Sequence, residues 1–139
     1  MPYVAILFLA LIAVDASADD LLWLEREWVS DADATMAANP ELAEGDSATQ
    51  AKWKRAYGQM RWTFRDGTLE TTQPGGVPFS VPYFVRQLGG DRFEILLNDT
   101  EAQTTFKISR TKRGFCADLQ LEEKARGYPY VECFSPNGA

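Results

Sequence analysis

Histidine is absent from this chain of 139 residues, and cysteine occurs only twice. Histidine is the commonest protein metal ligand and the side chain that titrates nearest neutral pH. Its absence therefore excludes Ser-His-Asp and Cys-His nucleophiles and most zinc sites. Two cysteines also cannot hold a four-cysteine iron–sulfur cluster. We expect neither a cofactor nor a metal site.

An excess of basic residues is also lacking, because the formal net charge is −6 at pH 7. Nucleic-acid-binding domains are usually basic, so we expect no nucleic-acid partner. The charge is uneven along the chain. Residues 19–50 carry nine acidic side chains and Arg26 as the single base, whereas basic side chains outnumber acidic ones from Ala51 onward.

No apolar run is long enough for a membrane span. The longest, from Tyr3 to Val14, has about 12 residues where a spanning helix needs about 20. Ala16-Ser17-Ala18 follows it with the small-residue pattern of a signal-peptidase site. We predict that residues 1–18 are a signal peptide, that 19–139 form a single domain, and that the protein is exported, periplasmic or secreted, without stable membrane insertion. The alternative is a retained helical anchor.

Export bears on the two cysteines. In an oxidising compartment Cys116 and Cys133 are expected to form one disulfide, which would stabilise the fold by about 3 kcal/mol on the chain-entropy model. Two free buried thiols are the alternative.

The N-terminal third of the expected domain has a helical pattern. Ser30 or Asp31 can cap a helix over 32–38, and Pro40 then restarts the chain. Ser47 and Gln50 have the spacing of a capping box for a second helix that stops at Gly58. Trp53 and Tyr57 lie four residues apart on it, and we expect this face to pack on a sheet.

From Gln59 onward apolar and polar residues alternate, which is typical of strands with one buried face. Asp66-Gly67 predicts a tight hairpin turn. The predicted fold class is mainly β: an antiparallel meander of about seven strands, or eight if Trp28-Val29 pairs, forming a small barrel or strongly curled sheet with one or two short N-terminal helices. Pro78 and Pro82 share a face of one strand, so we expect that strand to lie at an edge or to bulge.

Several of these segments together resemble small exported bacterial lipocalin-like (calycin-type) proteins. They are Leu24–Asp31, the short helix through Thr35, the hairpin Trp62–Leu69, and Val81–Val85. The resemblance implies a single-sheet barrel with a binding or structural role rather than an enzymatic one. Arg26 departs from the pattern, because the family usually has glycine two residues before this tryptophan. The departure weakens the expectation that the N-terminal turn packs closely under the barrel.

The first candidate site is the barrel interior. Its expected lining, on the apolar sides of the strands, is Trp62, Phe64, Tyr83, Phe93, Phe106 and Phe115. We expect a non-enzymatic exported binding domain that holds a small apolar or amphipathic ligand there, since an eight-stranded barrel is just wide enough for one. The alternative is a filled core in a protein-interaction module of the cell envelope, an inhibitor or assembly subunit. Such a module would bind its partner through the strand around Pro78–Pro82 and through exposed Phe84 and Tyr128.

Glu132 is the second candidate. If the two cysteines bond across neighbouring strands, Glu132 turns inward with Phe134, and it could anchor a polar group of a ligand. The alternative is a wet position on the barrel rim.

Two charged features complete the candidates. Arg110, Lys112 and Arg113, with Lys107 nearby, form a basic tip that either docks an anionic surface or is a solvated turn. The acidic pairs Asp31/Asp33 and Glu122/Glu123 could serve carboxylate catalysis, but adjacent acids are usually a surface feature. No nucleophile motif such as G-x-S-x-G or S-x-x-K is present, so we expect no enzyme.

Overall fold

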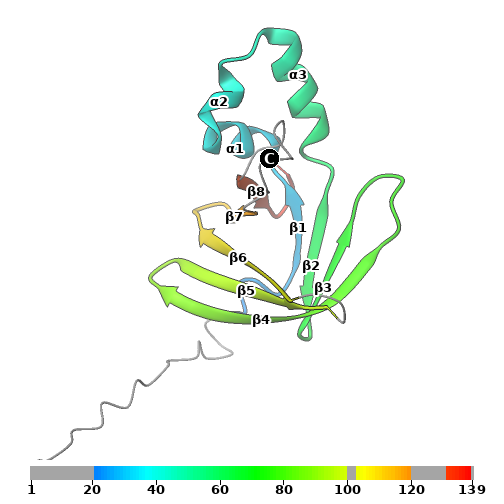
Figure 1. The fold of residues 1–139 in the computed structure, drawn as a ribbon, viewed down its shortest axis with the longest axis vertical. Coiled ribbons are helices and arrows are strands. Elements are labelled where there is room, and N and C mark those ends of the chain that lie inside the picture. Colours follow the sequence, from blue (N-terminus) through cyan, green and yellow to red (C-terminus); the bar gives the residue numbers. More distant parts are fainter. Residues whose placement is uncertain (1–20, 100–102, 120–130, 139) are drawn as a thin grey trace, which may run out of the picture.

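The fold was analysed in a computed structural model, which describes residues 21–99, 103–119 and 131–138. In these ranges eight antiparallel strands form a closed barrel, with each strand paired to the next and β8 paired to β1 (Figure 1). The strands are β1 (Glu27–Ser30), β2 (Arg61–Arg65), β3 (Thr68–Thr72), β4 (Phe79–Gly89), β5 (Arg92–Asn98), β6 (Gln103–Arg110), β7 (Phe115–Asp118) and β8 (Val131–Ser135). The prediction of a mainly β meander is confirmed. Trp28-Val29 does pair, as part of β1, and brings the number of strands in the described ranges to eight.

The hairpin of β2 and β3 has the predicted turn. Asp66 and Gly67 both have positive φ, at 52° and 74°, as a two-residue turn matched to the twist of the strands requires. Along β2, Trp62 and Phe64 are buried, whereas Arg61 and Arg65 are exposed. The alternation in the sequence therefore sets which face of this hairpin forms the core.

Strand β4 changes partner part-way along its length. Its first half pairs with β3, ending at Thr68 opposite Pro82, and its second half pairs with β5, starting at Tyr83 opposite Leu97. Pro82 directly precedes Tyr83, the first residue of β4 that pairs with β5, so its missing N–H falls at the end of that ladder. The predicted edge character is thus local, since the barrel as a whole is closed.

Three helices lie at one end of the barrel: α1 (Ala32–Ala38), α2 (Pro40–Ala43) and α3 (Ser47–Ala56) (Figure 1). The predicted cap at Asp31 is correct, because its Oδ1 accepts a hydrogen bond from Ala34 N at 3.0 Å. The predicted capping box at Ser47 is wrong. Asp46, one residue earlier, caps α3 through Thr49 N at 2.8 Å, and the Gln50 side chain donates instead to the carbonyls of Ala43 and Gly45.

The expected packing of α3 on the sheet is not found among the described contacts, in which α3 lies against α1 and α2. Trp53 and Tyr57 do share a face, and their rings stack at 5.9 Å. The helix has no fully buried residue. Helical spacing predicted the pair correctly but could not identify the surface that it meets.

Helix α1 completes the closure of the barrel. Strand β1 is short and pairs with β8 only at Val29 and Ser30. Beyond that point α1 satisfies the backbone of β8: Asp31 N donates to Cys133 O at 2.8 Å, and Cys133 N donates to Thr35 Oγ1 at 2.9 Å. One helical turn further, Asn39 Nδ2 donates to Val131 O at 2.7 Å, and Asn39 Oδ1 accepts from Val131 N.

The opposite end of the barrel is covered by residues 21–26. Leu24 is fully buried in the core, and its carbonyl accepts a hydrogen bond from Trp28 Nε1 at 2.9 Å. Arg26 does not prevent this close packing, because its guanidinium lies over the Trp28 ring, 5.4 Å from the centroid. The N-terminal turn therefore packs under the barrel despite the missing glycine.

The closure by α1 predicts that Asn39→Ala is destabilising. The substitution leaves a half-buried N–H and C=O of β8 without their partner, which should lower the free energy of unfolding by about 2 kcal/mol in equilibrium urea denaturation. Asn137→Ala, at an exposed asparagine, is the matched control. Equal, small losses in both variants would contradict this role of Asn39.

Candidate functional site

The predicted lining residues lie inside the barrel, most of them in one network of rings. Trp62, Phe64, Phe93 and Phe106 are buried, and Tyr83 is half-buried. Ring centroids lie 5.6 Å apart for Trp62 and Phe106 and 5.0 Å apart for Phe64 and Tyr83. Phe93 joins the network through Trp23, at 5.6 Å.

The rings meet across the barrel as well as along it. Phe115 on β7 lies 6.1 Å from Trp62 and 6.2 Å from Phe64, both on β2, although β2 and β7 are not neighbours in the sheet. Phe134 stacks on Trp62 at 4.4 Å and on Phe115 at 5.1 Å. Side chains therefore occupy the middle of the barrel at this level, which favours the filled-core alternative over a ligand cavity.

Three aromatic members of this core were not among the predicted site residues: Trp23, Trp28 and Phe134. Trp23 belongs to no strand, so no alternating pattern could indicate it. Its ring nevertheless contacts Trp28 at 6.0 Å and Phe115 at 6.4 Å.

Glu132 points inward as the cysteine pairing predicted, and the rim alternative is wrong. Its side chain lies on the face of β8 that carries Phe134, and the residue is only 6% exposed. The Ser30 hydroxyl donates to Glu132 Oε1 at 2.7 Å and accepts from Gly58 N at 3.0 Å. Burial raises the pKa of the Glu132 carboxyl, and the hydrogen bond from Ser30 only partly offsets this. Glu132 thus links β8, β1 and the end of the helical segment.

The predicted disulfide is confirmed. Cys116 and Cys133 are directly opposite each other on β7 and β8, with Cα atoms 4.0 Å apart. The bond crosslinks the two strands beside Glu132. Its formation fits the oxidising compartment expected from the predicted signal peptide.

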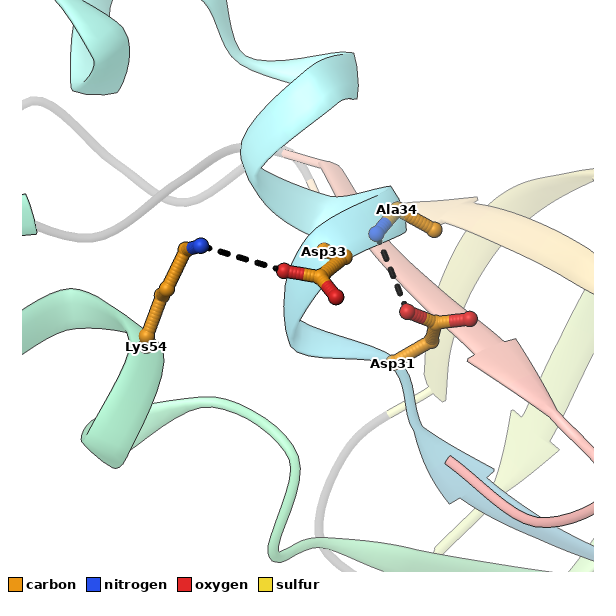
Figure 2. A network of polar contacts seen from close by, with 4 residues as sticks. All are labelled: Asp31, Asp33, Ala34 and Lys54. Carbon is orange, nitrogen blue, oxygen red and sulfur yellow. Dashed lines mark hydrogen bonds and ion pairs between the residues drawn. The ribbon is translucent and has the colours of Figure 1, made fainter. Parts of the chain in front are cut away.

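The acidic pair Asp31/Asp33 is held apart by structural contacts (Figure 2). Asp31 is buried at the start of α1, where it caps Ala34 N, whereas exposed Asp33 forms an ion pair with Lys54 of α3 at 3.3 Å. Each carboxylate thus has a local partner, and the geometry favours the surface-and-cap interpretation over paired carboxylates. Glu122/Glu123 and Tyr128 lie outside the described residues, as does the predicted signal peptide.

An apolar groove lies beside the second half of β4, the half that pairs with β5. It has a volume of about 310 Å³ and is lined by Leu21, Leu22, Glu25, Gly67, Tyr83, Phe84 and Val85. Phe84 is 59% exposed. Burial, and then the negative charges of Glu25 and Asp66, raise the pKa of the Tyr83 phenol. The groove is therefore apolar with an acidic margin.

The basic tip forms the turn between β6 and β7. Arg110, Lys112 and Arg113 line a second hollow together with the indoles of Trp23 and Trp28. Lys107 is not part of it, since it lies back along β6 opposite Asp118.

No described group of three or more cysteine, aspartate or glutamate side chains is placed to hold a metal ion. None of the helices in the described ranges is long and apolar enough to cross a membrane. Comparison with protein-family models, with curated proteins and with solved structures found no match for this chain. The resemblance to lipocalin-like proteins stays a prediction.

The burial of Glu132 predicts a pH-dependent effect of Glu132→Gln. The amide oxygen can still accept from Ser30, but the variant has no proton to lose. Because the folded-state pKa lies above the ordinary value of 4.5, the native protein loses stability relative to the variant as the pH rises from below 4.5 through the folded-state pKa.

Urea denaturation across this pH range measures the effect. Glu132→Gln should have nearly the wild-type free energy of unfolding at the acidic end and a higher one at neutral pH. Glu70→Gln, at an exposed glutamate, controls for the lost charge. A difference between variant and wild type that does not change with pH would refute the assignment.

Proposed function

We propose that this protein is an exported, non-enzymatic binding domain that holds an extended segment of a partner protein along the open edge of β4. It is the protein-interaction alternative predicted from the sequence, with the binding edge on the second half of β4 instead of around Pro78–Pro82. The observation that carries the proposal is the change of partner in β4, whose second half pairs with β5 and with no other strand of the described residues.

The backbone of this edge is available for pairing. Tyr83 N donates to Gly67 O at 3.0 Å, so the backbone N–H of Tyr83 points to the β3 side of β4. In a strand every second residue faces the same way, and Val85 and Gln87 therefore direct their N–H and C=O groups away from β5. No backbone hydrogen bond joins either residue to another described segment on that side. An extended peptide could pair there as an added strand.

The surroundings of the edge indicate the chemistry of the partner. The apolar groove can receive an apolar side chain of the added strand, and exposed Phe84 can pack on the next one along the same face. Neither Glu25 nor Asp66 forms an ion pair within the described part of the chain. We therefore expect the partner segment to carry a lysine or arginine beside its apolar residues.

The filled barrel supports this function over ligand capture. The ring contacts among Trp62, Phe115 and Phe134 occupy the space that an internal ligand would need. Titration with fatty acids, followed by tryptophan fluorescence, tests the competing function. A saturable change that Phe84→Ala leaves intact would favour a ligand in the barrel.

The edge itself is tested by a pair of proline variants. Val85→Pro removes an N–H that pairs with no described strand, together with part of a side chain that packs on the core, whereas Arg86→Pro removes an N–H that faces β5. Arg86→Pro should therefore cost about 2 kcal/mol or more of unfolding free energy beyond the cost of Val85→Pro. Similar losses in the two variants would mean that the edge is not open.

Partner binding is tested by crosslinking in the native host. A photoreactive phenylalanine analogue at position 84 should crosslink to one partner segment, and the same analogue at exposed Arg55 on α3 is the control. In the complex the amides of Val85 and Gln87 should become protected from hydrogen exchange, and Val85→Pro should abolish binding while the protein remains folded. A partner that binds without this protection, or equally well to Val85→Pro, would sink the proposal.

A further inference from the structure

The basic hollow lies at the end of the barrel covered by residues 21–26, apart from the apolar groove. It has a volume of about 270 Å³ and is lined by Trp23, Arg26, Trp28, Arg110, Thr111, Lys112, Arg113, Gly114 and Pro136. Four of its lining side chains are cationic and none is acidic. This composition is unusual in a chain whose net charge is −6.

Two of the four cations lie over aromatic rings. The Arg110 guanidinium lies 4.7 Å from the centroid of the Trp23 ring, and the Arg26 guanidinium lies 5.4 Å from that of Trp28. The two indoles are packed edge to face against each other and into the core. A cation–π contact holds a guanidinium beside the ring without neutralising its charge, so its N–H groups remain able to bind an anion.

The other two cations sit on a turn with a fixed backbone. Thr111 N donates to Gly114 O at 2.8 Å, and Gly114 N donates to Thr111 Oγ1 at 3.0 Å. Gly114 also packs directly on β8, where a Cβ atom would lie 1.9 Å from Phe134 O. These contacts hold the backbone of Lys112 and Arg113 beside the hollow that their side chains line.

None of the four cations has a carboxylate within 4.0 Å in the described ranges. By contrast, Lys54, Arg61 and Arg86 each pair with an acidic side chain. Four like charges around one hollow repel each other, and an anion bound between them would remove this repulsion.

We propose that the basic hollow binds a phosphate ester. Two guanidinium groups held beside one hollow suit the several oxygens of a phosphate, which arginine binds in bidentate fashion. The ester could belong to a soluble phosphorylated metabolite or to a phospholipid headgroup, because the recognised group is the same in both.

The test uses the purified protein with its disulfide intact and follows the indole N–H signals of its four tryptophans by NMR. Glycerol 3-phosphate at low ionic strength should shift the signals of Trp23 and Trp28 in a saturable manner and leave those of Trp53 and Trp62 unchanged. Cosedimentation with vesicles of phosphatidylcholine, with or without phosphatidylglycerol, distinguishes the sources. Binding to the glycerol 3-phosphate alone indicates a soluble ester, and additional binding to the phosphatidylglycerol vesicles indicates a headgroup.

A matched pair of double variants locates the site. Lys112→Gln/Arg113→Gln should weaken binding about tenfold or more, as expected for the loss of charge-assisted hydrogen bonds. Lys52→Gln/Arg55→Gln, on exposed positions of α3, removes the same charge and should leave the affinity nearly unchanged. Equal weakening by both pairs, or no saturable shift of Trp23 and Trp28 together with no vesicle binding, would overturn the proposal.

Discussion

The barrel depends on the way in which α1 completes the pairing of β8. Strand β1 meets β8 at only two positions, which would leave the remaining backbone groups of β8 unsatisfied inside a packed fold. Asp31, Thr35 and Asn39 supply those hydrogen bonds from one face of α1. The aromatic core is enclosed because α1 forms the hydrogen bonds to β8 that a longer β1 would otherwise form.

Glu132 and the disulfide belong to the same junction. Cys133 is bonded to Cys116 through its side chain, and its backbone is hydrogen-bonded to Thr35 of α1. The preceding residue, Glu132, points inward and accepts a hydrogen bond from Ser30. Ser30 Oγ in turn accepts a hydrogen bond from Gly58 N, just after the helical segment. Three parts of the chain distant in sequence thus converge on one short stretch of β8, and the proposed binding regions at the other end lie on the barrel that this stretch closes.

Local signals predicted the parts of the structure that depend on near neighbours. The β2–β3 hairpin follows from Asp66-Gly67 and the alternation of Trp62 and Phe64, and the inward direction of Glu132 follows from strand parity once the cysteines are paired. The missed features depend on long-range placement. Nothing local to Trp23 shows that it meets Phe93 and Arg110, and the stagger that opens β4 is set by the lengths of β3 and β5. The local signal for the role of α1 is the pair Thr35 and Asn39, two polar residues four positions apart on one helical face.

The pairing of the first strand with the last has a kinetic consequence. The hydrogen bond from Ser30 to Glu132 spans 102 residues, and contacts of such long range form late in folding because the intervening chain must first be confined. The barrel therefore cannot close during synthesis before β8 has emerged. Under the predicted export, a precursor that crosses a membrane unfolded would benefit from this delay, and the disulfide would form only after the crossing, in a compartment where thiols are oxidised.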